Sequence, residues 1–275
     1  MLRYAKVAGI WRHVQGWKKN LSSSGLVLPE PATDAYLAEE TDIRPSDLTL
    51  FPVFDQKGLG SCVANMGCDQ LTLLRIRLGL VLRQFSRLDL YWWLRHYEGT
   101  SPTEDSGAQI DSVAKVLAMR GCSWDSTWPY DESKFALQPP PETDTEAALH
   151  KATLGYKCGS VRAIRASLTQ GFGVGFGFTV FQNVMSDECA ATGIVKMPET
   201  GEAEVGGHGC MILGSKDSMV IGNSKGAFRF RNHWWMNVDG VMVPWGDAGD
   251  GWIPYDYFEK GYATDAETLR HAAVA

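Results

Sequence analysis

The stretch Gln56-Lys57-Gly58-Leu59-Gly60-Ser61-Cys62 decides how this chain folds and what chemistry it can perform. A Gly-rich turn leads into Cys62, and apolar residues then recur every three or four positions from Val63 to about Leu80. This spacing predicts a helix with one buried face, which begins beside Cys62. At a helix N-terminus, free backbone N–H groups and the helix dipole favour the thiolate, the nucleophilic form of cysteine. The amide of Gln56 can point to the same place, where with the Cys62 N–H it would form an oxyanion hole.

The composition indicates a folded protein with a sizeable core. The chain has 275 residues, of which 44% are hydrophobic, and its net charge of −6 argues against a nucleic-acid partner. We expect no transmembrane segment, because no apolar run approaches the ~18 residues that a membrane span needs. The six cysteines form no C-x-x-C pair, so we expect reduced thiols and no structural metal site.

The order of the remaining elements indicates an α+β fold with two lobes. Apolar spacing predicts further helices over 87–97, 110–120 and 160–170. Short β-rich runs separated by turn residues follow at 174–181, 209–213, 219–222 and 228–231. We expect a helical lobe over about 55–160 and a β-rich lobe over about 161–260, within a domain that covers 46–275.

Residues 1–45 are expected to form an N-terminal extension. Five Lys/Arg and no acidic residue fall within residues 1–20, between apolar residues at helical spacing, and a Ser- and Pro-containing linker follows. This pattern predicts a basic amphipathic helix. Such a helix either packs on its own domain or binds a membrane surface or a protein partner. Basic residues interrupt the apolar core that a signal peptide would need, so none is expected.

A cysteine nucleophile needs a base, and His208 is the strongest candidate among six histidines. It stands in Gly206-Gly207-His208-Gly209, just before an apolar β run. Glycines on both sides allow a substrate or another backbone to approach closely, and Gly207 is therefore a candidate for contact with substrate.

Together these segments resemble the papain-like cysteine peptidases in order and spacing. The matches are Gln56 to Cys62, Gly207-His208, an asparagine motif, and Trp245-Gly246-Asp247. Asp105-Ser106-Gly107-Ala108 resembles the segment that pairs with the substrate backbone in that family, which implies substrate contacts at Ser106 and Gly107. The resemblance covers roughly residues 47–260 and implies two lobes, one helical and one a β-rich half-barrel, with a peptide-binding cleft between them.

The resemblance also implies a cysteine-type endopeptidase. Cys62 would attack a peptide carbonyl, His208 would carry the proton, and Gln56 would help to hold the oxyanion. No metal or organic cofactor is required. A thiol acyl-transferase would use the same residues. The stretch before Cys62 is far shorter than the inhibitory propeptides of the lysosomal members, and residues 1–45, lying across the cleft, are one candidate for restraining activity.

Two asparagines compete for the role of orienting His208. Asn223-Ser224-Lys225-Gly226 keeps the Ser and Gly of the family motif but lacks its tryptophan. Asn232-His233-Trp234 keeps the tryptophan, which would shield the Asn–His hydrogen bond from water, but has His233 in place of serine. We favour Asn232, and Asn223 remains the alternative.

The altered motif motivates a rival hypothesis, in which the chain is a catalytically weak or inactive structural or interaction protein. Short members of this type resemble phage-encoded proteins, so a virion or tail component is one form of it. Residues 1–20 would then contact a protein partner. The lack of the cysteine that secreted members carry three residues before the nucleophile fits a reducing compartment, so we expect a cytoplasmic or virion-associated protein.

Overall fold

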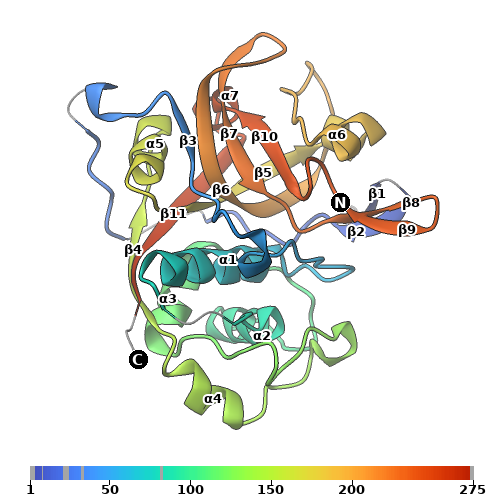
Figure 1. Cartoon of the computed structure of the whole chain (residues 1–275). Coiled ribbons are helices and arrows are strands. Elements are labelled where there is room, and N and C mark those ends of the chain that lie inside the picture. The colour runs from blue at the N-terminus through green and yellow to red at the C-terminus, as the bar shows by residue number, and fades with distance from the viewer. Residues whose placement is uncertain (1–3, 8, 21–24, 32–33, 81–82, 273–275) are drawn as a thin grey trace.

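Two lobes meet along one central helix, as the computed structural model in Figure 1 shows. The structure describes residues 4–7, 9–20, 25–31, 34–80 and 83–272. The helical lobe contains α1 (Cys62–Arg77), α2 (Arg87–Tyr97), α3 (Asp111–Met119) and α4 (Glu142–Ala147). The predicted helices over 63–80, 87–97 and 110–120 are confirmed. The mixed α+β class is therefore confirmed as well.

Within the described residues, an antiparallel sheet of seven strands forms the other lobe. Its order is β10-β7-β6-β5-β11-β4, and β3 pairs with β6. The strands are β3 (Glu40–Asp42), β4 (Ala152–Lys157), β5 (Val174–Phe181), β6 (Glu204–Ile221), β7 (Ser224–Arg231), β10 (Asp250–Pro254) and β11 (Ala263–Ala272). Three further helices belong to the same lobe as the sheet: α5 (Val161–Thr169), α6 (Asp187–Thr192) and α7 (Tyr255–Glu259). Short 3-10 helices occur at Asp34–Tyr36, Leu48–Leu50, Glu132–Lys134 and Gln182–Met185.

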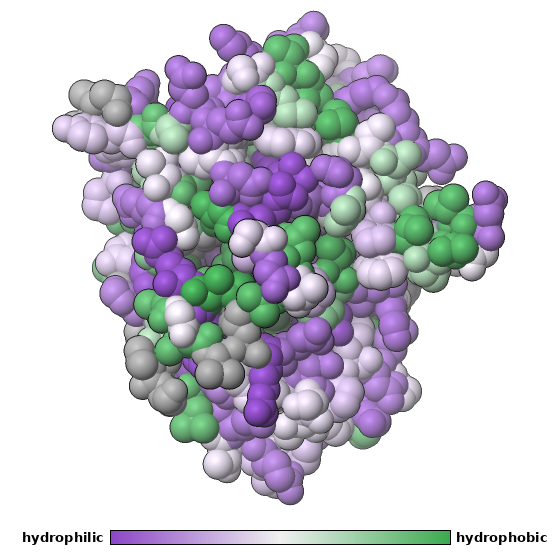
Figure 2. Space-filling view, viewed as in Figure 1, coloured by the Kyte–Doolittle hydropathy of each residue, from purple (hydrophilic) through white to green (hydrophobic). Residues whose placement is uncertain are grey.

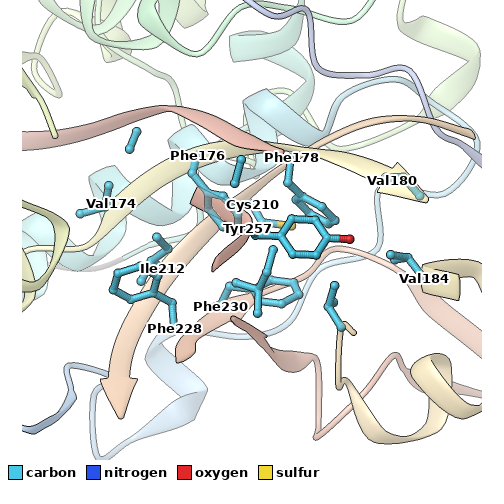
Figure 3. Close-up of a cluster of buried hydrophobic side chains, with 14 of the residues drawn as sticks. Val174, Phe176, Phe178, Val180, Val184, Cys210, Ile212, Phe228, Phe230 and Tyr257 are labelled. Atoms are coloured by element: carbon cyan, nitrogen blue, oxygen red, sulfur yellow. The ribbon is translucent and has the colours of Figure 1, made fainter. Parts of the chain in front are cut away.

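Strand β5 explains how the sheet and the helical lobe approach one another. Its alternate side chains Val174, Phe176, Phe178 and Val180 point into the core of the β-rich lobe. Figure 3 shows Phe176 and Phe178 there beside Phe230 and Tyr257. The opposite face carries glycines, and a Cβ on Gly175 would lie only 2.3 Å from Sδ of Met66 in α1. Successive side chains of a strand point to opposite faces of the sheet. One face of β5 therefore carries the aromatic core residues, and the other carries glycines against which α1 packs.

The prediction of a basic helix in residues 1–20 is wrong for the residues that the structure describes there. They form a hairpin of β1 (Tyr4–Val7) and β2 (Ile10–His13), and an extended segment follows. The reason is tertiary: the side chains of Arg12 and His13 are buried, and the backbone after them pairs with both lobes. These contacts outweigh the helical spacing of the apolar residues.

A second hairpin, of β8 (Trp235–Val238) and β9 (Val241–Pro244), projects beside the first. Val238, Val241 and Met242 are exposed on it, and Figure 2 shows the hydrophobic tip at the right-hand edge of the molecule. Strand β6 also differs from expectation, because the runs predicted at 209–213 and 219–222 belong to one strand. Among the described residues, no helix is both long and apolar enough to cross a membrane.

Candidate active site

The thiol of Cys62 lies where the two lobes touch. Cys62 is the first residue of α1, and its Sγ accepts a hydrogen bond from the backbone N–H of Gly209 in β6 at 3.3 Å. The residue that follows His208 is therefore packed directly against the sulfur. The side chains of Cys62 and His208 are both fully buried.

His208 is held by Asn232, which follows β7. Its Nε2 lies 2.8 Å from Oδ1 of Asn232, and the backbone N–H of His233 donates to the same Oδ1 at 2.7 Å. Two donors on one atom identify that atom as the amide oxygen, so the His208 proton lies on Nε2 and the lone pair on Nδ1. Within the described part of the chain, Nδ1 of His208 has no hydrogen-bond partner. That nitrogen is free to accept a proton.

Trp234 covers this pair. Its ring stacks on the imidazole of His208 with centroids 4.3 Å apart and an interplanar angle of 22°, and it is fully buried. A hydrogen bond shielded from water in this way is electrostatically stronger. The structure thus brings Asn232 to His208, whereas Asn223 lies in the exposed turn between β6 and β7.

Gln56 lies in the turn that leads to Cys62, and its side chain is buried. One N–H of its amide donates to Leu59 O at 3.0 Å, which leaves the second amide hydrogen for another acceptor. The backbone of Gln56 is fixed at both ends: its N–H donates to His233 O at 2.9 Å, and its carbonyl accepts from the Tyr130 hydroxyl at 2.8 Å. The turn is therefore anchored to both lobes.

Residues 13–18, here called the cleft segment, lie across this site. The backbone N–H of Gly207 donates to Val14 O at 2.6 Å, and on the opposite wall the N–H of Ala108 donates to Gly16 O at 2.9 Å. The segment runs parallel to the chain on both walls. Gly107, with a φ of 72°, is so close that a Cβ there would lie 2.4 Å from Gly16 O. The sequence predicted that a substrate would contact Gly107 and Gly207. In the structure the cleft segment lies against both of these residues.

Ser106 has a different environment from its neighbour Gly107. Its hydroxyl donates to Gly107 O at 3.1 Å, and the hydroxyl oxygen lies 3.3 Å from that of Thr100. These contacts lie within the loop before Ala108, the residue that bonds the cleft segment. The structure gives Ser106 a supporting position at the edge of the cleft.

The indole of Trp17 occupies a slot between two strands. A Cβ on Gly177 of β5 would lie 2.0 Å from the ring, and one on Gly207 of β6 would lie 2.7 Å from it. Only glycine at both positions leaves room for a flat ring. At the end of the slot, Trp17 Nε1 donates to Oδ2 of Asp265 at 3.0 Å. The slot therefore combines apolar walls with an acidic end.

Ion pairs anchor both ends of the cleft segment. Arg12, just before it, bonds Asp55 at 2.7 Å and also donates to Trp235 O. Lys18 bonds Glu98 at 2.7 Å. The segment is thereby fastened to the helical lobe and to the base of the β8–β9 hairpin.

Burial of the two side chains shifts both pKa values towards the neutral forms. Loss of solvent around Cys62 raises the pKa of its thiol to about 12. Hydrogen bonds from the backbone of Gly209 and Val63 lower the pKa, but their effect is smaller. Loss of solvent likewise lowers the pKa of His208 to about 3. The sequence predicted a thiolate at the helix N-terminus. In the buried site the neutral thiol is favoured instead, because the cost of desolvating the charge exceeds the stabilisation that the helix N-terminus provides.

Sequence reasoning missed the partner of His233. Its Nε2 lies 2.8 Å from Oδ2 of Asp69 in α1, and both side chains are buried. Asp69 falls two helical turns after Cys62, so the spacing places both on one face of α1, but nothing in the sequence linked it to position 233. It also missed Asp105, whose carboxylate accepts from Gly60 N at 3.0 Å and so fixes the turn before Cys62.

All six cysteines are free and buried. Among the described residues, no group of three or more His, Cys, Asp or Glu side chains could hold a metal ion. The site itself presents a thiol at Cys62, an imidazole at His208 and amide groups at Gln56 and Asn232.

Comparison with known proteins agrees with this geometry. A scan against protein-family models finds no match. An uncharacterised peptidase C1-like protein of Acanthamoeba polyphaga mimivirus is 33% identical over 222 residues, which cover 77% of this chain and 67% of the relative. The crystal structure of xylellain, a cysteine protease of Xylella fastidiosa, superposes with a TM-score of 0.82 at 24% identity over 98% of both chains. Procathepsin L 3 of Tenebrio molitor gives 0.64 at 19% identity, over 90% of this chain and 74% of that one. The chain belongs to the peptidase C1-like family of papain-like cysteine peptidases.

Proposed function

We propose that this chain is an active thiol endopeptidase, with Cys62 as nucleophile and His208 as proton carrier, and that the cleft segment restrains it. The observation that carries the proposal is the pair of His208 and Asn232 beside the Cys62 thiol. The pair leaves Nδ1 of His208 free to take a proton, while Nε2 is held at 2.8 Å by Asn232. This is the relation of base to orienting group that nucleophilic catalysis requires.

The proposed reaction uses these groups in two stages, acylation of the thiol and hydrolysis of the thioester. Cys62 gives its proton to Nδ1 of His208, and the thiolate attacks the carbonyl carbon of the substrate. The backbone N–H of Cys62 and the free amide hydrogen of Gln56 donate to the oxygen that becomes negative. The imidazolium of His208 then protonates the leaving amine, and the C–N bond breaks. Water, activated by the neutral imidazole, hydrolyses the thioester and regenerates the thiol.

Two carbonyls of the cleft segment are engaged by the walls of the cleft and not by the oxyanion donors. The carbonyls of Val14 and Gly16 accept hydrogen bonds from Gly207 and Ala108 on the two walls, so neither carbonyl is directed to the oxyanion donors. Gly16 brings no side chain to the thiol. Burial under the segment also keeps Cys62 and His208 neutral, and the segment must leave before a thiolate–imidazolium pair can form.

The test compares the full chain with Cys62→Ser, His208→Ala and Gly16→Leu. Peptide hydrolysis is measured with fluorogenic peptides, and Cys62 alkylation by iodoacetamide is followed by peptide mass mapping. We expect slow hydrolysis by the full chain, faster hydrolysis by Gly16→Leu, and none by the other two. If the Gly16→Leu chain alkylates at an ordinary thiol rate, unchanged by His208→Ala, and cleaves no peptide, the fold serves a binding role. Product masses with and without an added amine separate hydrolysis from acyl transfer.

A further inference from the structure

The side chain of His233 connects the loop after β7 to the helix that carries the thiol. His233 is fully buried, and its Nε2 lies 2.8 Å from Oδ2 of Asp69. Asp69 lies in the middle of α1, seven residues after Cys62. At 3.6 residues per turn, seven residues are close to two turns, so both side chains leave the same face of the helix.

The backbone of His233 contacts two other parts of the site. Its N–H donates to Oδ1 of Asn232 at 2.7 Å, the oxygen that also accepts a hydrogen bond from His208 Nε2. Its carbonyl accepts from the N–H of Gln56 at 2.9 Å. A shift of His233 would therefore move Asn232 and the turn of Gln56 together.

We propose that Asp69 and His233 are a positioning pair, which sets the placement of the imidazole and the oxyanion turn relative to the thiol on α1. The inference rests on the proposed function. Neither side chain touches the reacting atoms. The pair acts through Asn232 and Gln56, and it joins segments that are 164 residues apart in sequence.

The chemistry of the pair explains why a histidine stands here. A buried carboxylate is costly unless a hydrogen-bonding or charged partner faces it. The imidazole is long enough to reach Asp69 from the loop and rigid enough to hold the loop at a fixed distance from α1. A serine at this position would leave the Asp69 carboxylate without the imidazole donor.

The experiment measures kcat and KM for a fluorogenic peptide in Asp69→Asn, His233→Ser and the double variant. Each is made in the full chain and in the Gly16→Leu chain, so that opening of the cleft and chemistry are separated. Rates are expressed per Cys62 thiol that iodoacetamide labels in the folded protein. We expect kcat to fall about 10- to 100-fold in each single variant, with KM changed less than about threefold, because small misplacements act on the chemical step. The double variant should fall no further than the singles.

The matched control is Asp89→Asn. Asp89 is also fully buried and paired with an arginine, Arg120, at 2.8 Å, but it lies in α2 away from the thiol. It should lower the melting temperature and leave kcat per labelled thiol unchanged. Unchanged kcat in Asp69→Asn and His233→Ser, or effects that add in the double variant, would overturn the inference.

A second measurement needs no substitution at the pair. In the ¹⁵N-labelled full chain, an imidazole N–H bonded to a buried carboxylate should give a slowly exchanging, far-downfield proton signal, assigned to His233 Nε2. Absence of that signal would also overturn the inference, even if the variants fail to fold. If no chain hydrolyses peptide while the signal is present, the proposed function fails and the pair survives as a structural contact only.

Discussion

Replacement of Gly16 by alanine should release the cleft segment. A Cβ at Gly16 would lie 2.7 Å from Sγ of Cys62 and 2.7 Å from the carbonyl oxygen of Gly60. Neither neighbour can retreat easily, because Cys62 is fixed at the start of α1 and the Gly60 N–H is bonded to Asp105 at 3.0 Å. The added methyl group therefore destabilises only the closed arrangement.

The size of the effect follows from the energy of overpacking. Inserting a methyl group into a packed site costs about 1–3 kcal/mol. Because the open arrangement does not carry this cost, the open fraction should rise about 5- to 150-fold, at 1.4 kcal/mol for each factor of ten. The backbone of Gly16 is outside the left-handed region, so alanine adds no conformational strain of its own.

The assay is the rate of Cys62 alkylation by iodoacetamide at fixed pH, with kcat/KM for a fluorogenic peptide beside it. When closing is faster than alkylation, the rate reports the open fraction directly. The control is Gly159→Ala, where a Cβ meets nothing within 4 Å. Equal alkylation rates in Gly16→Ala and the parent chain would refute the reasoning, and so would an equal rise in Gly159→Ala.

Three further predictions concern the same site. Burial holds the pKa of His208 at about 3, and exposure should return it towards about 6.5, so protons bind the open form better. Because half of the open form is already protonated at pH 6.5, lowering the pH from 6.5 to 5 should favour opening by about 1.7 kcal/mol, or about 16-fold. The measurement is faster exchange of the Ala108 and Gly207 amides after correction for intrinsic rates. Asn232→Ala should lower kcat about 100-fold, whereas Asn223→Ala should leave it unchanged, and equal effects would contradict the assignment. In the Gly16→Ala chain, peptides with tryptophan or phenylalanine placed to enter the vacated indole slot should be cleaved faster than their alanine counterparts, and a flat profile would exclude this use of the slot.

Much of the framework was predictable because it depends on local pattern. The apolar spacing after Cys62 gives α1, and the alternation in 174–181 gives β5 at the observed bounds. The choice of Asn232 over Asn223 depended on Trp234, whose ring does stack on His208. Each of these features is determined by residues that are close to it in the sequence.

The parts that sequence did not predict depend on contacts between distant segments. Residues 4–7 and 10–13 lie in a stretch with helical spacing of apolar residues but form strands, because Arg12 reaches Asp55 and the backbone beyond it pairs with Gly207 and Ala108. The Asp69–His233 pair likewise joins two elements whose proximity only the folded chain defines. The raised pKa of the thiol depends on its burial in the folded chain, which no sequence motif predicts.

The position of β11 also governs when the molecule can assemble during synthesis. This strand, formed by residues 263–272, lies between β5 and β4, and Gln70 of α1 donates to Glu267 O at 2.7 Å. Translation delivers β4 and β5 long before the strand that joins them, and such non-local pairing closes slowly. The surface on which α1 rests is therefore incomplete on the ribosome until nearly all of the described chain has emerged. A nascent chain therefore has no finished cleft between its two lobes before residues 263–272 have left the exit tunnel.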